Sequence, residues 1–285
     1  MNVTTESKIP ATSAATKVCL VTGASSGIGE SLAYEFSSHG AKLIISSRDE
    51  MELNRVKNNC SSSENIFVLP FDLTSQADIE SSAGLAINKW SGIDYLIHNA
   101  GMAARDLVVN TDMSVFRMVM DTNYFGPVAL TKAVLPSMLH AKKGHIIVVS
   151  SLSGKFGVPK LSAYAGAKHA LHGFFDSLRT ETEKTGIKIS IIIPGFVNTP
   201  ILLKAIDGKG TVTGKNLAVN EKGMSAGECA KRMVRAIEKG KQETLIGGCE
   251  KLSVYFHRFF PGTFKLVMAN HPLRKLRNTF AGFFK

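Results

Sequence analysis

Cysteine is scarce in this chain of 285 residues, and the four that occur, Cys19, Cys60, Cys229 and Cys249, are scattered. None of them has the spacing of zinc ligands, which argues against a structural zinc site and favours a reducing compartment. Residues 1–16 are polar and rich in Ser and Thr, without the apolar segment of a signal peptide. No clean apolar run reaches roughly 18 residues, so no transmembrane helix is expected. We therefore expect a cytoplasmic protein with a flexible tail over residues 1–16.

Negative charge is scarce in the last third of the chain. The whole sequence has 34 Lys and Arg against 23 Asp and Glu, a net charge of +11. From residue 200 onward the counts are 16 and 6, whereas over the first 199 residues they are 18 and 17. A nucleic-acid surface would explain such a bias, but no recognised nucleic-acid module is present. We expect no nucleic-acid partner, and we interpret the charge as a basic surface that attracts an anionic cofactor or substrate.

Short apolar segments alternate with amphipathic helical patterns. With 44% hydrophobic and 20% charged residues, the composition fits one domain with a sizeable core. The predicted strands are Val18–Val21, Lys42–Ser46, Ile66–Pro70, Tyr95–His98, His145–Val149, Ile187–Ile193 and Thr244–Ile246. Apolar strands separated by helices indicate a parallel sheet covered on both faces. We predict an α/β fold, a Rossmann-type doubly wound parallel sheet in a single domain, with its ligand at the carboxyl ends of the strands.

A glycine-rich loop, Thr22-Gly23-Ala24-Ser25-Ser26-Gly27-Ile28-Gly29, joins the first strand to the helical pattern 31–38. Strand, glycine loop and helix form the context of a dinucleotide fingerprint, whereas a lone glycine-rich stretch would be an ordinary turn. Gly23 permits the tight turn, Gly27 lets the backbone approach a pyrophosphate, and Gly29 lets the helix pack closely. The helix N-terminus offers N–H groups to the phosphates. The predicted cofactor contacts in this loop are Gly23, Ser25, Ser26, Gly27, Ile28 and Gly29.

The residues after the second strand bear on which dinucleotide binds. An NAD site of this type has a carboxylate just past this strand, whereas a nearby arginine suits a 2′-phosphate. Here Ser47 stands where the acid would be, and Arg48 follows it, which favours NADP(H). The alternative is that Asp49 binds the ribose and Arg48 is a surface charge. Asp49 also opens the next helix as a plausible N-cap.

Tyr164 and Lys168 are four residues apart on a predicted helix, and Ser151 precedes Tyr164 by thirteen positions. Residues at this spacing project from one helix face. A phenol with an ordinary pKa near ~10 becomes a proton shuttle when a fixed cation stabilises its anion. A serine hydroxyl can then hold a substrate oxygen. With the dinucleotide loop, the set is suited to protonating a carbonyl while a hydride arrives from a cofactor.

In combination these motifs resemble the short-chain dehydrogenase/reductase family, over about residues 17–248. The matching motifs are Thr22-Gly23-x3-Gly27-x-Gly29, Asn99-Ala100-Gly101, Asn123, Ser151, Tyr164-x3-Lys168, and Pro194-Gly195 with Thr199. The stretch 150–164 is similar to the branch containing the 11β-hydroxysteroid dehydrogenases. His98 departs from the pattern, because many members carry an asparagine there. That position usually supports the strand end and not the chemistry.

The resemblance implies a role for each matching residue. Tyr164 would donate or take the proton and also contact the cofactor, and Ser151 would steady the substrate oxygen. Lys168 would bind the nicotinamide ribose and lower the tyrosine pKa, and Asn123 would hold a water that extends the proton path. The other implied cofactor contacts are Asp72 at the adenine, Leu73, Asn99, Ala100, Gly101, Pro194, Gly195, Val197 and Thr199.

Some of these residues have simpler explanations. Asp72 could cap the helix that begins near residue 75, Asn99 could be a turn residue, and Asn123 could lie on an exposed helix face. Ser150 and Ser153 compete with the family serine, whose choice depends on its spacing to the tyrosine.

The resemblance places the substrate beside the nicotinamide. The predicted substrate contacts are Ser151, Ser153, Tyr164 and Phe196, and plausible wall residues, any of which could instead be core, are Met102, Leu152, Phe156 and Val158. The segment Pro200–Gly223 opens with Ile201-Leu202-Leu203 and then becomes rich in Gly and Lys. An apolar stretch beside a flexible one suggests a lid over a lipophilic substrate.

The C-terminal segment mixes aromatic and basic residues. We divide the chain into the tail 1–16, an NADP-binding catalytic domain over 17–249 and a basic aromatic extension over 250–285. The extension could lie on an anionic membrane surface as a peripheral contact. It could equally cover the substrate cleft or pack against a neighbouring subunit.

The sequence thus favours an NADP(H)-dependent oxidoreductase that interconverts a ketone and a secondary alcohol on a lipophilic substrate. One alternative is a 3-oxoacyl-thioester reductase, whose acidic acyl carrier could meet the basic last third. Another, outside enzymes, is an NADP(H)-responsive binding or scaffold protein, although such a protein has no need of a proton relay. The resemblance implies a homodimer or homotetramer formed through the helices that begin near Asn123 and Leu161.

Overall fold

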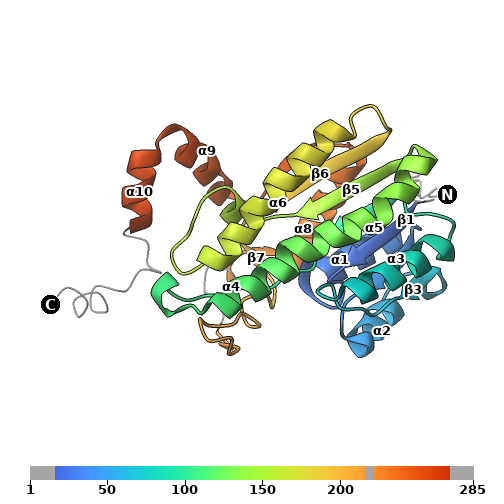
Figure 1. Cartoon of the computed structure of the whole chain (residues 1–285), viewed down its shortest axis with the longest axis horizontal. Coiled ribbons are helices and arrows are strands. Elements are labelled where there is room, and N and C mark those ends of the chain that lie inside the picture. The colour runs from blue at the N-terminus through green and yellow to red at the C-terminus, as the bar shows by residue number, and fades with distance from the viewer. Residues whose placement is uncertain (1–16, 216–220, 270–285) are drawn as a thin grey trace, which may run out of the picture.

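In the computed structural model, which describes residues 17–215 and 221–269, seven parallel strands form one central sheet (Figure 1). Their order across the sheet is β3-β2-β1-β4-β5-β6-β9. The strands are β1 Val18–Thr22, β2 Lys42–Ser46, β3 Ile66–Val68, β4 Tyr95–His98, β5 Gly144–Val149, β6 Ile187–Pro194 and β9 Glu243–Ile246. All seven predicted strands are present, and their ends agree with the prediction within two residues. The doubly wound parallel fold predicted from the sequence is therefore confirmed.

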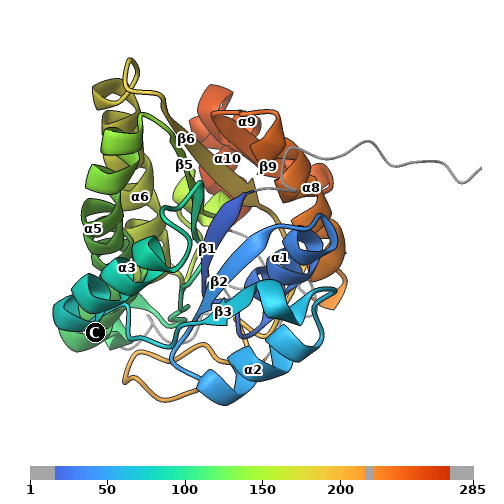
Figure 2. The ribbon, with the colours of Figure 1, turned by 90° about the vertical axis from the view of Figure 1, so that its right-hand side faces the viewer.

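Helices cover both faces of the sheet (Figure 2). One layer contains α1 Gly27–Ser38, α2 Glu50–Asn58 and α8 Ala226–Glu238; the other contains α3 Gln76–Lys89, α5 Gly126–Ala141 and α6 Ser162–Glu181. Successive side chains of β1 point to opposite faces of the sheet. Cys19 and Val21 pack against the layer that contains α1, and Val18 and Leu20 pack against the layer that contains α6. The β1 side chains are all buried, which explains their continuous apolar sequence.

The strand order reverses between β1 and β4, which are paired neighbours. The connections from β1 and β4 leave the sheet in opposite directions, so a crevice opens at the carboxyl ends of these two strands. Two short strands, β7 Val197–Asn198 and β8 Met224–Ser225, pair with each other beyond the end of β6. Helix α4 Met113–Met120 lies against α6 and leads into a π-helical turn, Asp121–Phe125.

The described part of the C-terminal segment forms two short helices, α9 Leu252–Phe259 and α10 Pro261–Ala269 (Figure 1). Phe264 of α10 is buried and meets Phe156, with ring centroids 5.0 Å apart. These helices are therefore attached to the core of the sheet layer that contains α6. The boundary at residue 249 remains a prediction. The tail 1–16 and the end of the extension lie outside the described residues.

Within the described ranges, every helix is too short or too polar to cross a bilayer. The four cysteines are all free thiols. Burial raises the pKa of the Cys229 thiol to about 12, so this side chain behaves as a small apolar group of the core.

Candidate active site

The glycine loop after β1 has the backbone geometry of a phosphate-binding turn. Gly23 and Gly27 have φ values of +67° and +61°, which side chains other than glycine rarely adopt. A Cβ at Gly29 would collide with the carbonyl oxygen of Gly23, so only glycine allows α1 to approach β1 this closely. Helix α1 begins after Ser26, whose side chain makes no capping hydrogen bond. The N–H groups at this end of α1 are thus available for an anion.

Asn99 and Thr22 join the phosphate loop to the end of β4. Asn99 Nδ2 donates to the carbonyl oxygens of Thr22 and Gly23 at 3.1 and 3.2 Å. Thr22 Oγ1 in turn accepts from the backbone N–H groups of Asn99 and Ala100, each at 3.1 Å. Asn99 is therefore more than a turn residue, because its amide fixes the loop against the neighbouring strand.

His98 supports the strand end, as the sequence predicts. Its Nε2 lies 2.8 Å from Thr131 Oγ1 inside the core. Burial lowers the pKa of His98 to about 3, so the imidazole is neutral at physiological pH.

The loop after β6 closes the crevice from the other side. A Cβ at Gly27 would lie 3.2 Å from the Cβ of Thr199, so the phosphate loop and this loop meet there. Glu250 Oε1 accepts from the backbone N–H groups of Phe196 and Gly248 at 3.3 and 3.0 Å. Glu250 thereby holds the loop that contains Pro194, Gly195 and Val197, and no sequence motif signalled it. Its contact joins positions 54 residues apart.

The residues predicted to meet the adenosine half of the cofactor follow β2 and β3. Asp49 Oδ1 accepts from the N–H of Glu52 at 3.0 Å, which confirms the predicted N-cap of α2. Arg48 is exposed. Asp72 accepts from the N–H and the hydroxyl of Thr74 at 2.9 and 2.8 Å. Burial by itself raises the pKa of Asp72, but these hydrogen bonds and the charge of Arg48 together lower it.

One alternative for Asp72 is wrong. The N-cap of α3 is Ser75, whose hydroxyl accepts from the N–H of Asp78, and not Asp72. The Leu73 side chain is buried in the core, where Gly126 packs directly against it because a Cβ there would touch its carbonyl oxygen. The cofactor contact of Leu73 stays a prediction.

Ser151 and Tyr164 meet at the carboxyl end of β5. Ser151 lies close enough to the tyrosine to lower its pKa, and Ser151 Oγ accepts from the N–H of Ser153 at 3.2 Å. Ser150 is engaged elsewhere, since its Oγ lies 2.9 Å from His172 Nε2 in the core. The assignment of Ser151 as the substrate-binding serine stays a prediction.

Lys168 is buried one helical turn beyond Tyr164 on α6. Its Nζ donates to the carbonyl oxygen of Val149 at 2.8 Å and lies 5.7 Å from the centroid of the Tyr164 ring. Burial lowers the pKa of Lys168 to about 8. Burial also raises the pKa of Tyr164 to about 12, against the hydrogen bond from Ser151, which lowers it. The sequence predicted a lowered tyrosine pKa, whereas in the protein alone desolvation has the larger effect.

Asn123 lies in the π-helical turn and is completely buried. Its Oδ1 accepts from the N–H of Met102, and its Nδ2 donates to the carbonyl oxygen of Met102, both at 2.8 Å. A Cβ at Gly101 would lie 3.1 Å from Asn123 Oδ1 and 3.7 Å from Lys168 Nζ, so the asparagine and the lysine flank the same glycine. The alternative of an exposed helix face is wrong for Asn123. π-turns of this kind occur frequently at functional sites.

The residues predicted to line the substrate region differ in their exposure. Phe196 is 37% exposed beside the crevice. Phe156 is buried against Phe264 and His257 and is therefore a core residue. Tyr164 itself packs against an apolar group formed by Ala103, Leu202, Ala205 and Ile201. The first part of the predicted lid thus packs as an apolar wall against the Tyr164 side chain.

Sequence reasoning missed Arg55, which lies beside the phosphate loop. Its Nη2 donates to the carbonyl oxygen of Ser25 at 3.3 Å and its Nη1 to Glu30 Oε1 at 2.7 Å. These contacts join α2 to positions 25 and 30 residues away, and no local pattern marks the arginine. The pair neutralises the carboxylate in the first turn of α1, which would otherwise repel a phosphate.

Comparison with known proteins places this geometry in a family. The sequence model of the family described as short chain dehydrogenase matches residues 17–209. The chain belongs to the short-chain dehydrogenase/reductase family. It is 37% identical over 267 residues to dehydrogenase/reductase SDR family member 7B of Mus musculus, covering 92% of this chain and 83% of that protein. It is also 37% identical over 268 residues to dehydrogenase/reductase SDR family protein 7-like of Drosophila melanogaster, covering 92% and 82%.

Solved structures of this family have the same fold. A short chain dehydrogenase/reductase from Burkholderia phymatum in complex with NAD has a TM-score of 0.76 at 22% identity, over 85% of this chain and 92% of that one. The closed form of serine dehydrogenase complexed with NADP+ has a TM-score of 0.73 at 24% identity, over 82% and 95%. The chain is thus a member of an oxidoreductase family with a Rossmann-type sheet.

Proposed function

We propose that this protein is an NADP(H)-dependent oxidoreductase that interconverts a ketone and a secondary alcohol on a lipophilic substrate. The observation that carries the proposal is the convergence of Ser151, Tyr164 and Lys168 at the carboxyl end of β5. The glycine loop lies at the carboxyl end of β1, across the switch point of the same sheet. A protein that only bound a dinucleotide would have no need of a buried lysine beside a half-buried phenol.

The residues of the crevice fit a nicotinamide dinucleotide. The uncapped N-terminus of α1 and the positive-φ glycines suit the pyrophosphate. Both solved structures named above are described as bound to NAD or NADP+. We assign the adenine end to Arg48 and Asp72 and the nicotinamide end to Lys168 and the loop 194–199. When bound, the nicotinamide supplies or accepts the hydride.

Tyr164 is suited to act as the proton donor in the reduction direction. A phenol with a pKa of about 12 keeps its proton at pH 7, and the alkoxide formed at a reduced carbonyl is a stronger base than phenolate. Ser151 would hold the carbonyl oxygen through its hydroxyl beside Tyr164. Lys168, with one N–H already donated to Val149, has further N–H groups for the ribose and for the phenolate left after proton transfer.

The apolar residues that pack against Tyr164 indicate the class of substrate. Ile201, Leu202 and Ala205 pack with Tyr164 and present no charge to it, which favours a lipophilic carbonyl compound. The reaction test is NADPH consumption over a panel of lipophilic ketones and acyl thioesters. Turnover of ketones supports the proposal, whereas turnover confined to acyl-carrier thioesters supports the 3-oxoacyl-thioester alternative. Tight NADPH binding without any turnover would favour the binding-protein alternative.

Arg48 underlies the proposed preference for NADP(H). It is exposed at the end of β2, and Asp49 is used as the α2 cap. We expect Arg48→Met to raise the KM for NADPH roughly 10- to 100-fold, because a charge-assisted contact with the 2′-phosphate is worth about 1.5–3 kcal/mol. The KM for NADH should not change. Steady-state kinetics with both cofactors measures this, and Lys57→Met on α2 is the matched control. Equal losses with the two cofactors would contradict the assignment.

We also propose a peripheral contact with an anionic membrane surface through α9 and α10. Tyr255, Phe259 and Leu266 are 54%, 71% and 65% exposed, and Arg258 and Lys265 lie beside them. Truncation at residue 248 is a poor test, because it would remove Phe264 from the core. We expect Phe259→Ser to reduce co-sedimentation with phosphatidylserine vesicles about fivefold or more. Met51→Ser, at an exposed methionine on α2, should bind as the wild type does. Equal co-sedimentation of both variants would contradict the proposal.

The family relation supports a homodimer or homotetramer formed through α5 and α6. Both helices lie on one outer side of the sheet (Figure 2). Between them is a cavity of about 190 Å³ lined by Leu135, Phe174 and Leu178 together with Thr131, Lys132, Ser177 and Glu181. Such a surface is suited to a partner helix.

A further inference from the structure

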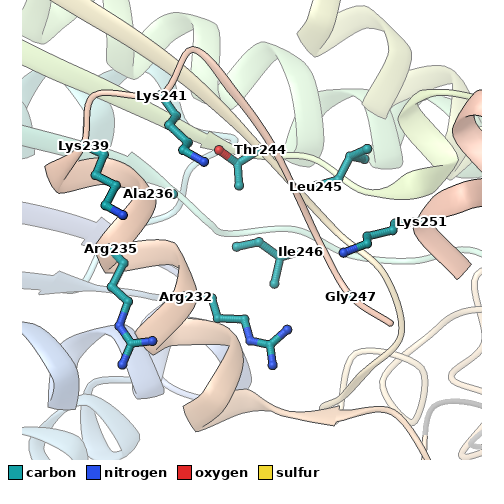
Figure 3. A pocket seen from close by; sticks show the side chains of 10 residues that line it. All are labelled: Arg232, Arg235, Ala236, Lys239, Lys241, Thr244, Leu245, Ile246, Gly247 and Lys251. Atoms are coloured by element: carbon teal, nitrogen blue, oxygen red, sulfur yellow. The ribbon is translucent and has the colours of Figure 1, made fainter. Parts of the chain in front are cut away.

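A basic cavity of about 220 Å³ lies along the outer edge of the sheet, between α8 and β9 (Figure 3). Five cationic side chains line it: Arg232, Arg235, Lys239, Lys241 and Lys251. They come from three places in the chain, namely α8, the turn into β9, and the segment after β9. No acidic side chain is among the residues that line it. None of the cavity residues belongs to the catalytic or cofactor set described above.

Most of these cations lack a counter-ion. Arg232 Nε pairs with Glu228 Oε1 at 2.7 Å. For the other four, no carboxylate of the described residues lies within 4.0 Å. Arg235 in the last turn of α8 and Lys239 at its C-cap are four residues apart, a spacing at which like charges repel. A concave site with several unpaired charges of one sign concentrates the field and attracts an ion of the opposite sign.

The wall also provides a polar group without a partner. Thr244 lines the cavity, and its Oγ1 is buried with no hydrogen-bond partner among the described residues. Arginine, lysine and threonine side chains are all donors to oxyanions, and the planar arginine fork matches phosphate well. The volume is below the ~300–1,000 Å³ of most sites for organic ligands, which suits a compact anion.

Self-association does not explain this surface. Strand β9 is at the edge of the sheet, and an edge strand can pair with a second copy of itself. In a symmetric pair, however, the same patch meets itself, so Lys239 and Lys241 of the two copies would be brought together. The charge therefore disfavours a second copy and favours an anionic ligand.

We propose that this cavity binds a phosphate-bearing anion, at a site separate from the active site. The ligand is a soluble phosphorylated molecule or the phosphorylated headgroup of a lipid, since both present the same oxyanion. The lipid source has structural support, because Lys251 directly precedes α9, where Leu252 and Tyr255 are 59% and 54% exposed. The site accounts for part of the basic excess in the last third of the chain, and it does not depend on the proposed reaction.

The test compares two double variants that remove the same charge. Lys239→Gln with Lys241→Gln alters the cavity. Lys184→Gln with Lys231→Gln is the control, because both lysines are exposed outside the cavity and Lys231 lies on the same helix. The substituted side chains are all exposed, so the fold should survive, which thermal unfolding checks. The probes are inorganic pyrophosphate, by isothermal titration calorimetry, and phosphatidylcholine vesicles with and without phosphatidylinositol bisphosphate, by co-sedimentation.

We expect the wild type and the control to bind at least one probe, and the cavity variant to bind it roughly 30-fold more weakly. This corresponds to about fivefold for each cation removed. Pyrophosphate binding identifies a soluble ligand, and binding only to the phosphoinositide vesicles identifies a headgroup; both support the site. Equal weakening of the two double variants would mean diffuse surface charge and would overturn it, as would no binding of either probe by the wild type.

Discussion

Tyr164→Phe should lower kcat/KM for a carbonyl substrate by about 10²- to 10⁴-fold, the usual contribution of a positioned general acid. The substitution removes the hydroxyl whose pKa Ser151 lowers. It keeps the ring, which packs against Leu202 and Ala205, so the fold and the crevice should be preserved. Binding of NADPH should survive, because the predicted phosphate and ribose contacts come from the glycine loop and Lys168.

The measurement is NADPH consumption with the best ketone of the panel, together with NADPH binding by fluorescence titration. Tyr124→Phe is the matched control: its ring packs against Phe125 and Phe174, away from Ser151 and Lys168, and the same atom is removed. We expect Tyr124→Phe to retain activity. Retained activity in Tyr164→Phe would show that Tyr164 is not the proton donor.

The fold was predictable because its signals are local. Each apolar segment that became a strand is bounded by helical patterns, and β2 and β4 have the predicted ends. The glycine loop was predictable for the same reason, since a turn with positive φ values and a tight helix approach restricts Gly23, Gly27 and Gly29 to one residue type. Such constraints depend on neighbours in the sequence.

The supporting contacts were not predictable, because they join distant segments. Glu250 holds the backbone N–H of Phe196, and Arg55 meets Glu30. Neither pairing leaves a periodic pattern. The contact between the Ser150 hydroxyl and His172 also joins distant positions and leaves no local pattern. The pKa of Tyr164 depends on burial, and the spacing of Tyr164 and Lys168 on a helix does not reveal how deeply either is buried.

Lys168→Met should abolish turnover and at the same time stabilise the protein without cofactor at pH 7. Burial lowers the pKa of Lys168 from 10.5 to about 8, which corresponds to about 3 kcal/mol of unfavourable free energy for the charged form. Methionine has a similar length and no charge. It leaves the carbonyl oxygen of Val149 without this donor, at a cost of about 1 kcal/mol. The net gain in the free energy of unfolding is therefore about 2 kcal/mol.

The dependence of this gain on pH identifies its cause. Below pH 8 the lysine is charged in both the folded and the unfolded wild type, so the folded state carries the full penalty. Between pH 8 and 10.5 the unfolded state binds more protons than the folded state, so wild-type stability rises with pH relative to the variant. Urea unfolding of both proteins at pH 7 and pH 9.5 measures the difference, and the advantage of Lys168→Met should shrink at the higher pH. Lys184→Met, at an exposed position, should show no such trend.

Two outcomes would contradict this prediction. Lys168→Met could be less stable than the wild type at pH 7, or the difference in free energy of unfolding could be the same at both pH values. Either result would mean that other groups in the folded protein compensate the buried charge of Lys168. In that case the buried catalytic lysine would not lower the free energy of unfolding, and the active site would cost the protein no stability.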